Sequence, residues 1–383
     1  MADTTTTDAF LSGQGIPVDL TKIETALAAL WGPAAEREGG PDLEHPSVTR
    51  VTLANLLVMD LGETPPKTDD VLDTVVARYP CRAIVVRRDD SLGRKVSAEI
   101  SALCHLPAPG MPQVCSERIL LKAGREGFDL IPGAVRPLLE ADLPLVLWWM
   151  GDPRVALPLF RELSGEANRA VLDLPDPSDD PEEVLAALDL SVNPFGRDLA
   201  WFGITRWREL TAQFFDPVGE ESILDGIRSV TIVAEAARAG SPPRVSAWFA
   251  AWLAGQLGWT PKSIVKVAPV KAVATFVGAR GEITVTILTE PEAGAVPAYL
   301  SSVSITATNR EGSDTSFHLV RLVDQVSVEV SCPGHCQLPR MVQAAEFTVP
   351  DRVSAALESA REDPPYRKAL PNMIWLLFGG APS

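Results

Sequence analysis

The spacing of apolar residues changes part-way along this chain, and that change constrains the fold more than any other feature. In the first part, short and nearly continuous apolar runs, such as Cys81–Val86 and Leu145–Trp149, alternate with segments whose apolar residues recur at helical spacing. Continuous apolar runs are typical of strands that are covered on both faces. Their alternation with helices predicts right-handed β-α-β crossovers and a parallel sheet between two layers of helices.

The first domain is expected to cover residues 18–240. Two further segments, Lys95–Leu106 and Pro112–Lys122, are joined by a Pro/Gly turn and predict an inserted hairpin. The predicted fold class is therefore α/β, a three-layer Rossmann-like domain with an inserted hairpin. Residues 1–17 precede it and contain Gly, Pro and charged residues, and we expect them to form a flexible tail.

A second domain is expected from residue 241 to residue 383. The stretch Ala239–Pro243 is small and helix-breaking, which is typical of a boundary. Val245–Leu257 is apolar nearly all round and predicts a buried helix that ends at Gly258. After it, apolar residues recur at every second position, and two helices close the chain. We therefore predict an α+β domain with an antiparallel sheet and C-terminal helices.

Charge and cysteine content narrow the partners and the compartment. The formal net charge is -16, with 34 Lys and Arg against 50 Asp and Glu, whereas nucleic-acid binding needs a basic face. No apolar window reaches the roughly 20 residues that span a bilayer, and the N-terminus lacks the pattern of a secretory signal. Five cysteines are few for 383 residues. These features predict a cytoplasmic protein that binds neither nucleic acid nor membrane.

The motifs that usually carry chemistry are missing. The sequence contains no G-x-G-x-x-G, no G-x-x-x-x-G-K-[ST] and no G-x-S-x-G. Acid-base or metal chemistry has few candidates, because the chain has only four histidines, at His45, His105, His318 and His335. The segment Cys332–Cys336 could supply one zinc hook, but no second hook follows. We expect no catalytic residue, no cofactor and no metal.

Two pairs of cysteines are candidate redox sites. If the turn of the predicted hairpin is symmetric about Pro109 and Gly110, Cys104 and Cys115 face each other across the two strands. Opposed Cβ atoms lie about 4.5–5.5 Å apart, beyond the roughly 3.5–4.5 Å of a disulfide, so two reduced thiols are expected and a reversible bond is the alternative. Cys332 and Cys336 form a second candidate pair, with a plain Pro-Gly turn as the alternative.

Aromatic residues gather in the segment that follows residue 200. On the helix predicted from Thr205, Trp207 and Phe214 share one face, while Arg208 and Phe215 share another. An aromatic face with an arginine is typical of a protein contact, but packing inside the chain would give the same pattern. The candidate interface residues are Trp201, Trp207, Arg208, Phe214, Phe215 and Asp216.

Several segments resemble one protein family. Asp142–Pro153 and Asp198–Asp216 resemble hallmark segments of the OpcA family, and Cys81–Val86 and Val114–Leu121 match it in order and spacing. The resemblance covers nearly the whole chain. It implies a non-catalytic protein that binds glucose-6-phosphate dehydrogenase, promotes its active oligomer and supports NADPH production in the oxidative pentose phosphate pathway. In photosynthetic bacteria the family is linked to redox control by thioredoxin, which makes thioredoxin a second candidate partner.

The competing interpretation is an enzyme or a sugar-phosphate-binding protein. Doubly wound α/β sheets usually bind ligands at the carboxyl ends of their strands. The charged residues that would line such a crevice are Arg87, Arg88, Asp152 and Arg154.

Overall fold

The computed structural model describes residues 4–35, 48–62, 68–108, 111–174, 185, 187–188, 194–215, 221–237, 242–292, 297–309, 311–323, 325–332, 335–336, 339–343, 348–359 and 362–379. The chain forms two compact units. Unit 1 comprises Met1–Asp173, Ala186–Arg197 and Ala356–Arg361, and unit 2 comprises Leu174–Leu185, Asp198–Ala355 and Glu362–Ser383. Each contains one nine-stranded sheet.

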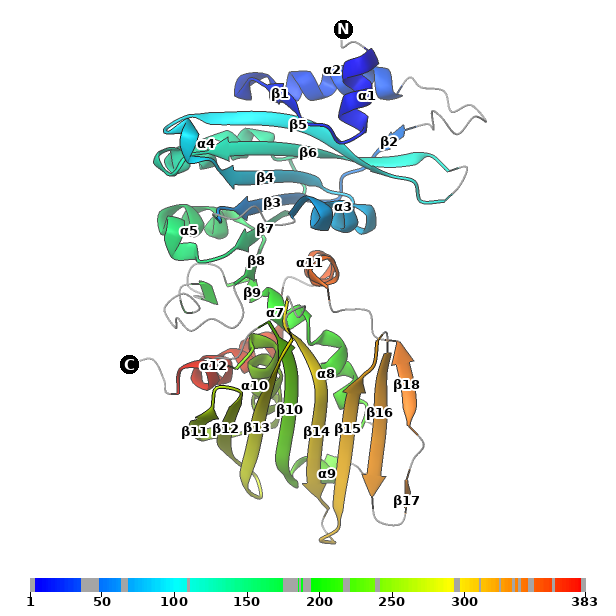
Figure 1. The fold of residues 1–383 in the computed structure, drawn as a ribbon, viewed down its shortest axis with the longest axis vertical. Coiled ribbons are helices and arrows are strands. Elements are labelled where there is room, and N and C mark those ends of the chain that lie inside the picture. The colour runs from blue at the N-terminus through cyan, green and yellow to red at the C-terminus, as the bar shows by residue number, and fades with distance from the viewer. Residues whose placement is uncertain are drawn as a thin grey trace. The chain divides into compact units, whose positions relative to one another are not determined.

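The sheet of unit 1 has a parallel centre, as the apolar runs predicted. Its order is β1-β5-β6-β4-β3-β7-β8-β9, with β2 beside β6 (Figure 1). Numbered along the chain, the central parallel strands β3, β4, β6, β7 and β8 follow the Rossmann order 3-2-1-4-5. The strands are β1 Ile16–Val18, β2 Val48–Arg50, β3 Asn55–Asp60, β4 Arg82–Arg88, β5 Val96–His105, β6 Gln113–Ala123, β7 Leu145–Met150, β8 Arg169–Asp173 and β9 Gly196–Asp198.

The N-terminal segment of unit 1 differs from the flexible tail that the sequence suggested. It contains helix α1, and Phe10 of this helix is fully buried, with its ring edge-on to that of Trp31 at 5.0 Å. Burial of this aromatic pair fixes the helix. The helices of unit 1 include α1 Thr4–Leu11, α2 Ile23–Ala35, α3 Thr68–Arg78, α4 Ile131–Val135 and α5 Leu157–Glu166. Short 3-10 helices occur at Leu20–Lys22, Asp90–Leu92, Arg125–Leu130, Arg136–Leu138 and Pro153–Ala156.

The sheet of unit 2 is mostly antiparallel, with the order β11-β12-β13-β10-β14-β15-β16-β17 and β18 beside β16 (Figure 1). Its one long parallel pair joins β10 and β13. From the period-two pattern we expected one strand over residues 265–276, but this stretch belongs to two strands, β11 and β12. The strands are β10 Ile227–Ala236, β11 Thr260–Ala268, β12 Lys271–Gly278, β13 Gly281–Pro291, β14 Tyr299–Thr308, β15 Asp314–Arg321, β16 Gln325–Cys332, β17 His335–Cys336 and β18 Arg340–Gln343.

Strand β10 accounts for a difference from the predicted domain boundary. We expected it to be the last strand of the first domain, ahead of a boundary at residues 239–243. Instead it lies inside the second sheet, paired with β13 and β14. Its residues alternate between buried and half-buried, so only one of its faces is covered. The segment after it is therefore a connection within unit 2.

Helices cover one face of the second sheet. Helix α10 contacts β10, β13 and β14, and α12 contacts α10 and β11. Gly258 ends α10 with a positive φ of 65°, as predicted for a C-terminal glycine. The helices are α7 Leu199–Phe202, α8 Thr205–Ala212, α9 Glu221–Leu224, α10 Arg244–Leu257, α11 Val349–Glu358 and α12 Pro364–Phe378.

Candidate functional site

The carboxyl ends of β3 and β7 mark the place where a Rossmann-like sheet usually binds its ligand. Asp60, the last residue of β3, is only 3% exposed there. Its carboxylate accepts hydrogen bonds from Thr68 Oγ1 at 3.0 Å and from Arg87 Nε at 3.4 Å. Arg87 also donates to Asp69 at 2.7 Å. Burial raises the pKa of Asp60, against the lowering effect of its hydrogen bond with Thr68.

Among the described residues, the end of β3 carries a buried acid, Asp60, which is already paired with Arg87. A pyrophosphate needs closely approaching backbone N–H groups, and residues 63–67, which follow β3, lie outside the described part of the chain. The cations predicted to line the crevice bind carboxylates of the same unit. Arg88 bonds Asp90, and Arg154 bonds Asp152 at 2.7 Å. A recess of about 530 Å³ is nevertheless present, lined by Gly62, Arg87, Arg88, Asp89, Asp90 and Lys122.

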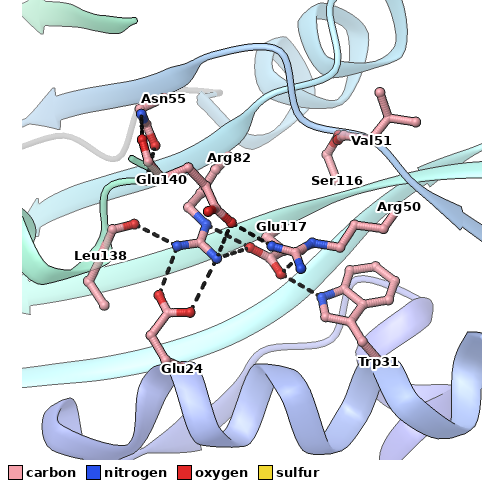
Figure 2. A network of polar contacts seen from close by, with 10 residues as sticks. All are labelled: Glu24, Trp31, Arg50, Val51, Asn55, Arg82, Ser116, Glu117, Leu138 and Glu140. Carbon is pink, nitrogen blue, oxygen red and sulfur yellow. Dashed lines mark hydrogen bonds and ion pairs between the residues drawn. The ribbon is translucent and has the colours of Figure 1, made fainter. Parts of the chain in front are cut away.

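A second polar network lies at the other ends of these strands, near the amino end of β4 (Figure 2). Glu117 of β6 is fully buried and accepts hydrogen bonds from Arg82 Nε at 2.7 Å and from Trp31 Nε1 at 2.6 Å. Arg50 Nε lies 3.0 Å from the same carboxylate. Arg82 also pairs with Glu24 of α2 at 2.8 Å.

The remaining contacts of Arg82 connect this network to the segment that follows α4. Arg82 donates to the carbonyl oxygen of Leu138 at 2.7 Å and pairs with Glu140 at 2.9 Å. Burial lowers the pKa of Arg82, but the charges of Glu117 and Glu24 outweigh it, so the pKa is raised. The network joins α2, β2, β4 and β6 near the amino end of β4. Ligand sites of such sheets lie at the other edge, so we assign it to stability.

The hairpin brings Cys104 and Cys115 into direct register, as the sequence indicated, but the expectation of two reduced thiols was wrong. The two residues form a disulfide, with Cα atoms 4.1 Å apart. That separation is shorter than in most opposed pairs, because the strands approach closest at pairs that exchange no backbone hydrogen bonds. Cys115 is fully buried, whereas half-buried Cys104 lines a recess of about 590 Å³ together with His105.

Of the other three cysteines, the structure describes the side chain of Cys81 alone. Cys81 is a buried free thiol, and burial raises its pKa to about 12. Such a thiol is unreactive, because the thiolate is the nucleophile. The backbone of Cys332 and Cys336 pairs β16 with β17, but their side chains lie outside the described part of the chain.

The aromatic segment folds around a buried acid. Asp198 is fully buried and caps α7 by accepting a hydrogen bond from the backbone N–H of Ala200 at 2.9 Å. Its carboxylate also accepts from Arg244 Nε at 2.9 Å and from Trp248 Nε1 at 2.8 Å. Trp201 meets the rings of Trp248 and Tyr366 edge-on, both at 5.3 Å.

The structure places the predicted interface residues inside unit 2. Trp201 and Trp207 are fully buried, and the guanidinium of Arg208 lies 3.7 Å from the ring centroid of Trp201. Phe214 and Phe215 are each 9% exposed and pack on Phe317 at 5.0 Å. Asp216 lies outside the described residues. The five described residues thus follow the internal-packing alternative.

The residues that hold this cluster together were missed at the sequence level. Asp198 and Arg244 are 46 positions apart and Tyr366 is farther still, so no local pattern connects them. One signal was present, because Arg244 begins a helix that is otherwise apolar nearly all round. A charge at such a position requires a buried partner.

Comparisons with known proteins match both halves of the chain. A family model described as the glucose-6-phosphate dehydrogenase subunit N-terminal domain matches residues 73–189, and the corresponding C-terminal domain model matches residues 195–370. This chain belongs to the OpcA family. The gap between the two OpcA matches lies close to the change from unit 1 to unit 2 near residue 198.

Curated OpcA relatives match about half of this chain. An OxPP cycle protein OpcA from Synechocystis sp. is 28% identical over 55% of this chain and 45% of its own length. The OpcA proteins of Synechococcus elongatus and Nostoc punctiforme are each 31% identical, over 50% and 51% of this chain. The aligned region spans less than half of each relative.

A solved structure of scyllo-inositol dehydrogenase from Lactobacillus casei is similar over 84% of this OpcA-family chain and 89% of its own, with 8% identity and a TM-score of 0.42.

Within the described residues, no helix is long and apolar enough to cross a membrane.

Proposed function

We propose that this chain is a non-catalytic, cytoplasmic assembly factor that binds glucose-6-phosphate dehydrogenase, promotes its active oligomer and raises its activity. This role would support NADPH production in the oxidative pentose phosphate pathway. The observation that carries the proposal is the pair of family matches, since both models are described as domains of a glucose-6-phosphate dehydrogenase subunit. The position of Asp60 supports the non-catalytic role. This buried acid lies at the carboxyl end of β3, where an enzyme with the same strand order would bind its dinucleotide.

The physical mechanism is a shift in the populations of the dehydrogenase. A bound protein activates an enzyme only when it binds the active conformation or oligomer more tightly than the inactive one. Equal affinity for both states would give a complex without activation.

A titration with the purified dehydrogenase tests this function. We expect the chain to co-sediment with the enzyme, to shift it toward a larger oligomer and to change its response to glucose-6-phosphate. An unrelated acidic protein at the same concentration is the control for nonspecific effects. A demonstrated complex with unchanged kinetics would overturn the activation, and turnover of glucose-6-phosphate by the chain alone would overturn its non-catalytic nature.

The disulfide of the hairpin is our candidate for redox regulation of this function. Thioredoxin is the reductant that we propose: its thiolate attacks Cys104, the half-buried partner, the Cys104–Cys115 bond breaks, and thioredoxin becomes the disulfide. Two electrons and two protons pass to the hairpin cysteines. Cys81 takes no part, because its thiol is buried.

Activation assays with oxidised and reduced chain test this regulation. We expect prior reduction by thioredoxin to change the activation, and the double variant Cys104→Ser, Cys115→Ser to give one level of activation under both conditions. If the double variant still responds to thioredoxin, another cysteine pair such as Cys332 and Cys336 is the switch and our assignment is wrong.

A second candidate function is favoured by the recess at the ends of β4 and β6, where Arg87, Arg88 and Lys122 gather. These cations could bind a sugar phosphate if they exchanged their present carboxylate partners for it. Thermal unfolding of the chain with glucose-6-phosphate tests this candidate. Stabilisation that is lost in Arg88→Ala would support it, and an unchanged unfolding temperature would exclude it.

A further inference from the structure

The two faces of the sheet in unit 2 differ sharply in composition. On one face, residues such as Ile232, Ile305 and Phe317 are at most 3% exposed. The alternate residues of the same strands, such as Thr231 and Ser304, are half-buried and lie on the other face. Helices α10 and α12 contact the sheet, and strands β10 to β16 form its broad, continuous centre (Figure 1).

Three rows of cross-strand neighbours form the middle of this second face, which we call the open face; a further row beside the second one includes Glu235 and Glu290. The first row is Val273, Thr286, Thr231, Ser304, His318 and Glu329. The second is Lys271, Leu288, Val233, Ser302, Val320 and Ser327. The third consists of hydroxyl residues alone: Thr275, Thr284, Ser229, Thr306, Ser316 and Ser331. Charged side chains occur in these rows only at Lys271 and Glu329, on the outer strands.

The open face approaches the size of a stable interface. Strands lie about 4.8 Å apart and alternate residues about 6.8 Å apart, so three rows across the six strands β12, β13, β10, β14, β15 and β16 cover roughly 590 Å². A standard protein interface buries about 800 Å² on each partner. Met341 of β18, 46% exposed and paired with Ser327, adds apolar area near one side of it.

We propose that the open face is the interface of a homodimer, in which it packs on the open face of a second copy. With a net charge of -16, two copies repel each other wherever charged surface meets, and this face lets them approach without opposing charges at its centre. A two-fold interface must also be complementary to itself. Hydroxyl groups meet that requirement, because each can both donate and accept a hydrogen bond.

The two charged residues set the orientation of the copies. The midpoint between β12 and β16 lies between β10 and β14. A two-fold axis parallel to the strands at this midpoint places β12 of one copy opposite β16 of the other. Lys271 then lies near Glu329 of the second copy, and the pair occurs twice. An axis across the strands would bring equal charges together instead.

Sedimentation of the full chain over a concentration series tests the homodimer. We expect a reversible monomer-dimer equilibrium that Thr231→Lys, at the centre of the face, weakens by roughly tenfold or more because like charges meet near the axis. Thr49→Lys, on β2 of unit 1, is the control and should leave the equilibrium unchanged. Circular dichroism and thermal unfolding verify that each variant is folded.

A charge swap tests the orientation. Lys271→Glu and Glu329→Lys should each weaken the dimer, and the double variant should restore it. A dimer that the double variant fails to restore would overturn the orientation. A chain that is monomeric at all concentrations, or a dimer indifferent to Thr231→Lys, would overturn the interface. If Thr231→Lys instead abolishes binding to glucose-6-phosphate dehydrogenase in a monomeric chain, the face belongs to that partner and the homodimer is wrong.

Discussion

The centre of the first sheet and the second sheet differ in how many of their faces are covered. Strands β3 and β7 of unit 1 are buried at nearly every position, whereas β10 and β15 of unit 2 are buried at every second position. A sheet centre covered on both faces must satisfy its polar groups internally, and Glu117 with its arginines does so. A sheet covered on one face keeps a surface for association. Strand periodicity therefore reports how many faces of a sheet are covered.

The largest effect is expected from the buried charge network of unit 1. Glu117→Ala should lower the free energy of unfolding by about 3–5 kcal/mol, because it removes the one fully buried carboxylate that Arg82 pairs with and leaves this buried charge with only partly exposed acidic partners. Urea denaturation measures this loss. The matched control is Glu99→Ala on β5 of the same sheet, whose pair with Lys122 is partly exposed and worth only about 0.2–1 kcal/mol. Equal losses in both variants would contradict the assigned role of the network.

Within unit 2, substitutions at two neighbouring residues of β14 test the difference between the covered face and the open face of the sheet. Ile305→Ala removes a side chain that is 1% exposed and should lower the free energy of unfolding by about 2–5 kcal/mol. Thr306→Ala, one residue on and on the open face, should cost less than about 1 kcal/mol. Both values come from urea denaturation of dilute protein, where association is absent. A reversed order would show that the covered face has been misassigned.

Reduction of the hairpin disulfide should have an intermediate to small effect. The bond closes a short loop in the unfolded chain, so its loss should lower the free energy of unfolding by up to roughly 3 kcal/mol. The measurement is urea denaturation with and without dithiothreitol. The double variant Cys104→Ser, Cys115→Ser should be insensitive to the reductant, and a remaining response would point to a different disulfide.

The smallest effect concerns the buried Asp60 and depends on pH. Its pKa is raised in the folded chain, so the folded state binds this proton more tightly than the unfolded state does. The stability contributed by this group therefore falls as pH rises from the unfolded pKa through the raised one. Relative to the unmodified chain, Asp60→Asn should be more stable near neutral pH than near pH 4. Denaturation midpoints across this range check the sign.

Local patterns predicted much of this structure. The continuous run Cys81–Val86 indicated a strand covered on both faces, and β4 is such a strand. The Pro/Gly turn set the register of the hairpin, which brings Cys104 opposite Cys115. Such features depend on residues close in sequence, so the sequence is sufficient to read them.

Long-range contacts decided the rest. The membership of β10 in the second sheet depends on strands that follow it by tens of residues, and only the assembled sheet reveals its partners. From the sequence alone, the aromatic residues of the helix that begins at Thr205 could have contacted a partner protein or packed inside the chain. Packing of Phe214 and Phe215 on Phe317 decided in favour of the core.

The two fold classes, the hairpin register and the family could be predicted from the amino-acid sequence, because periodicity, turn residues and long motifs are properties of contiguous segments. The folded structure was needed for the unit boundary, the disulfide, the buried partners of Asp198 and the open face of the second sheet. These depend on which distant segments come together, and on the burial that results, and no single stretch of sequence carries that information.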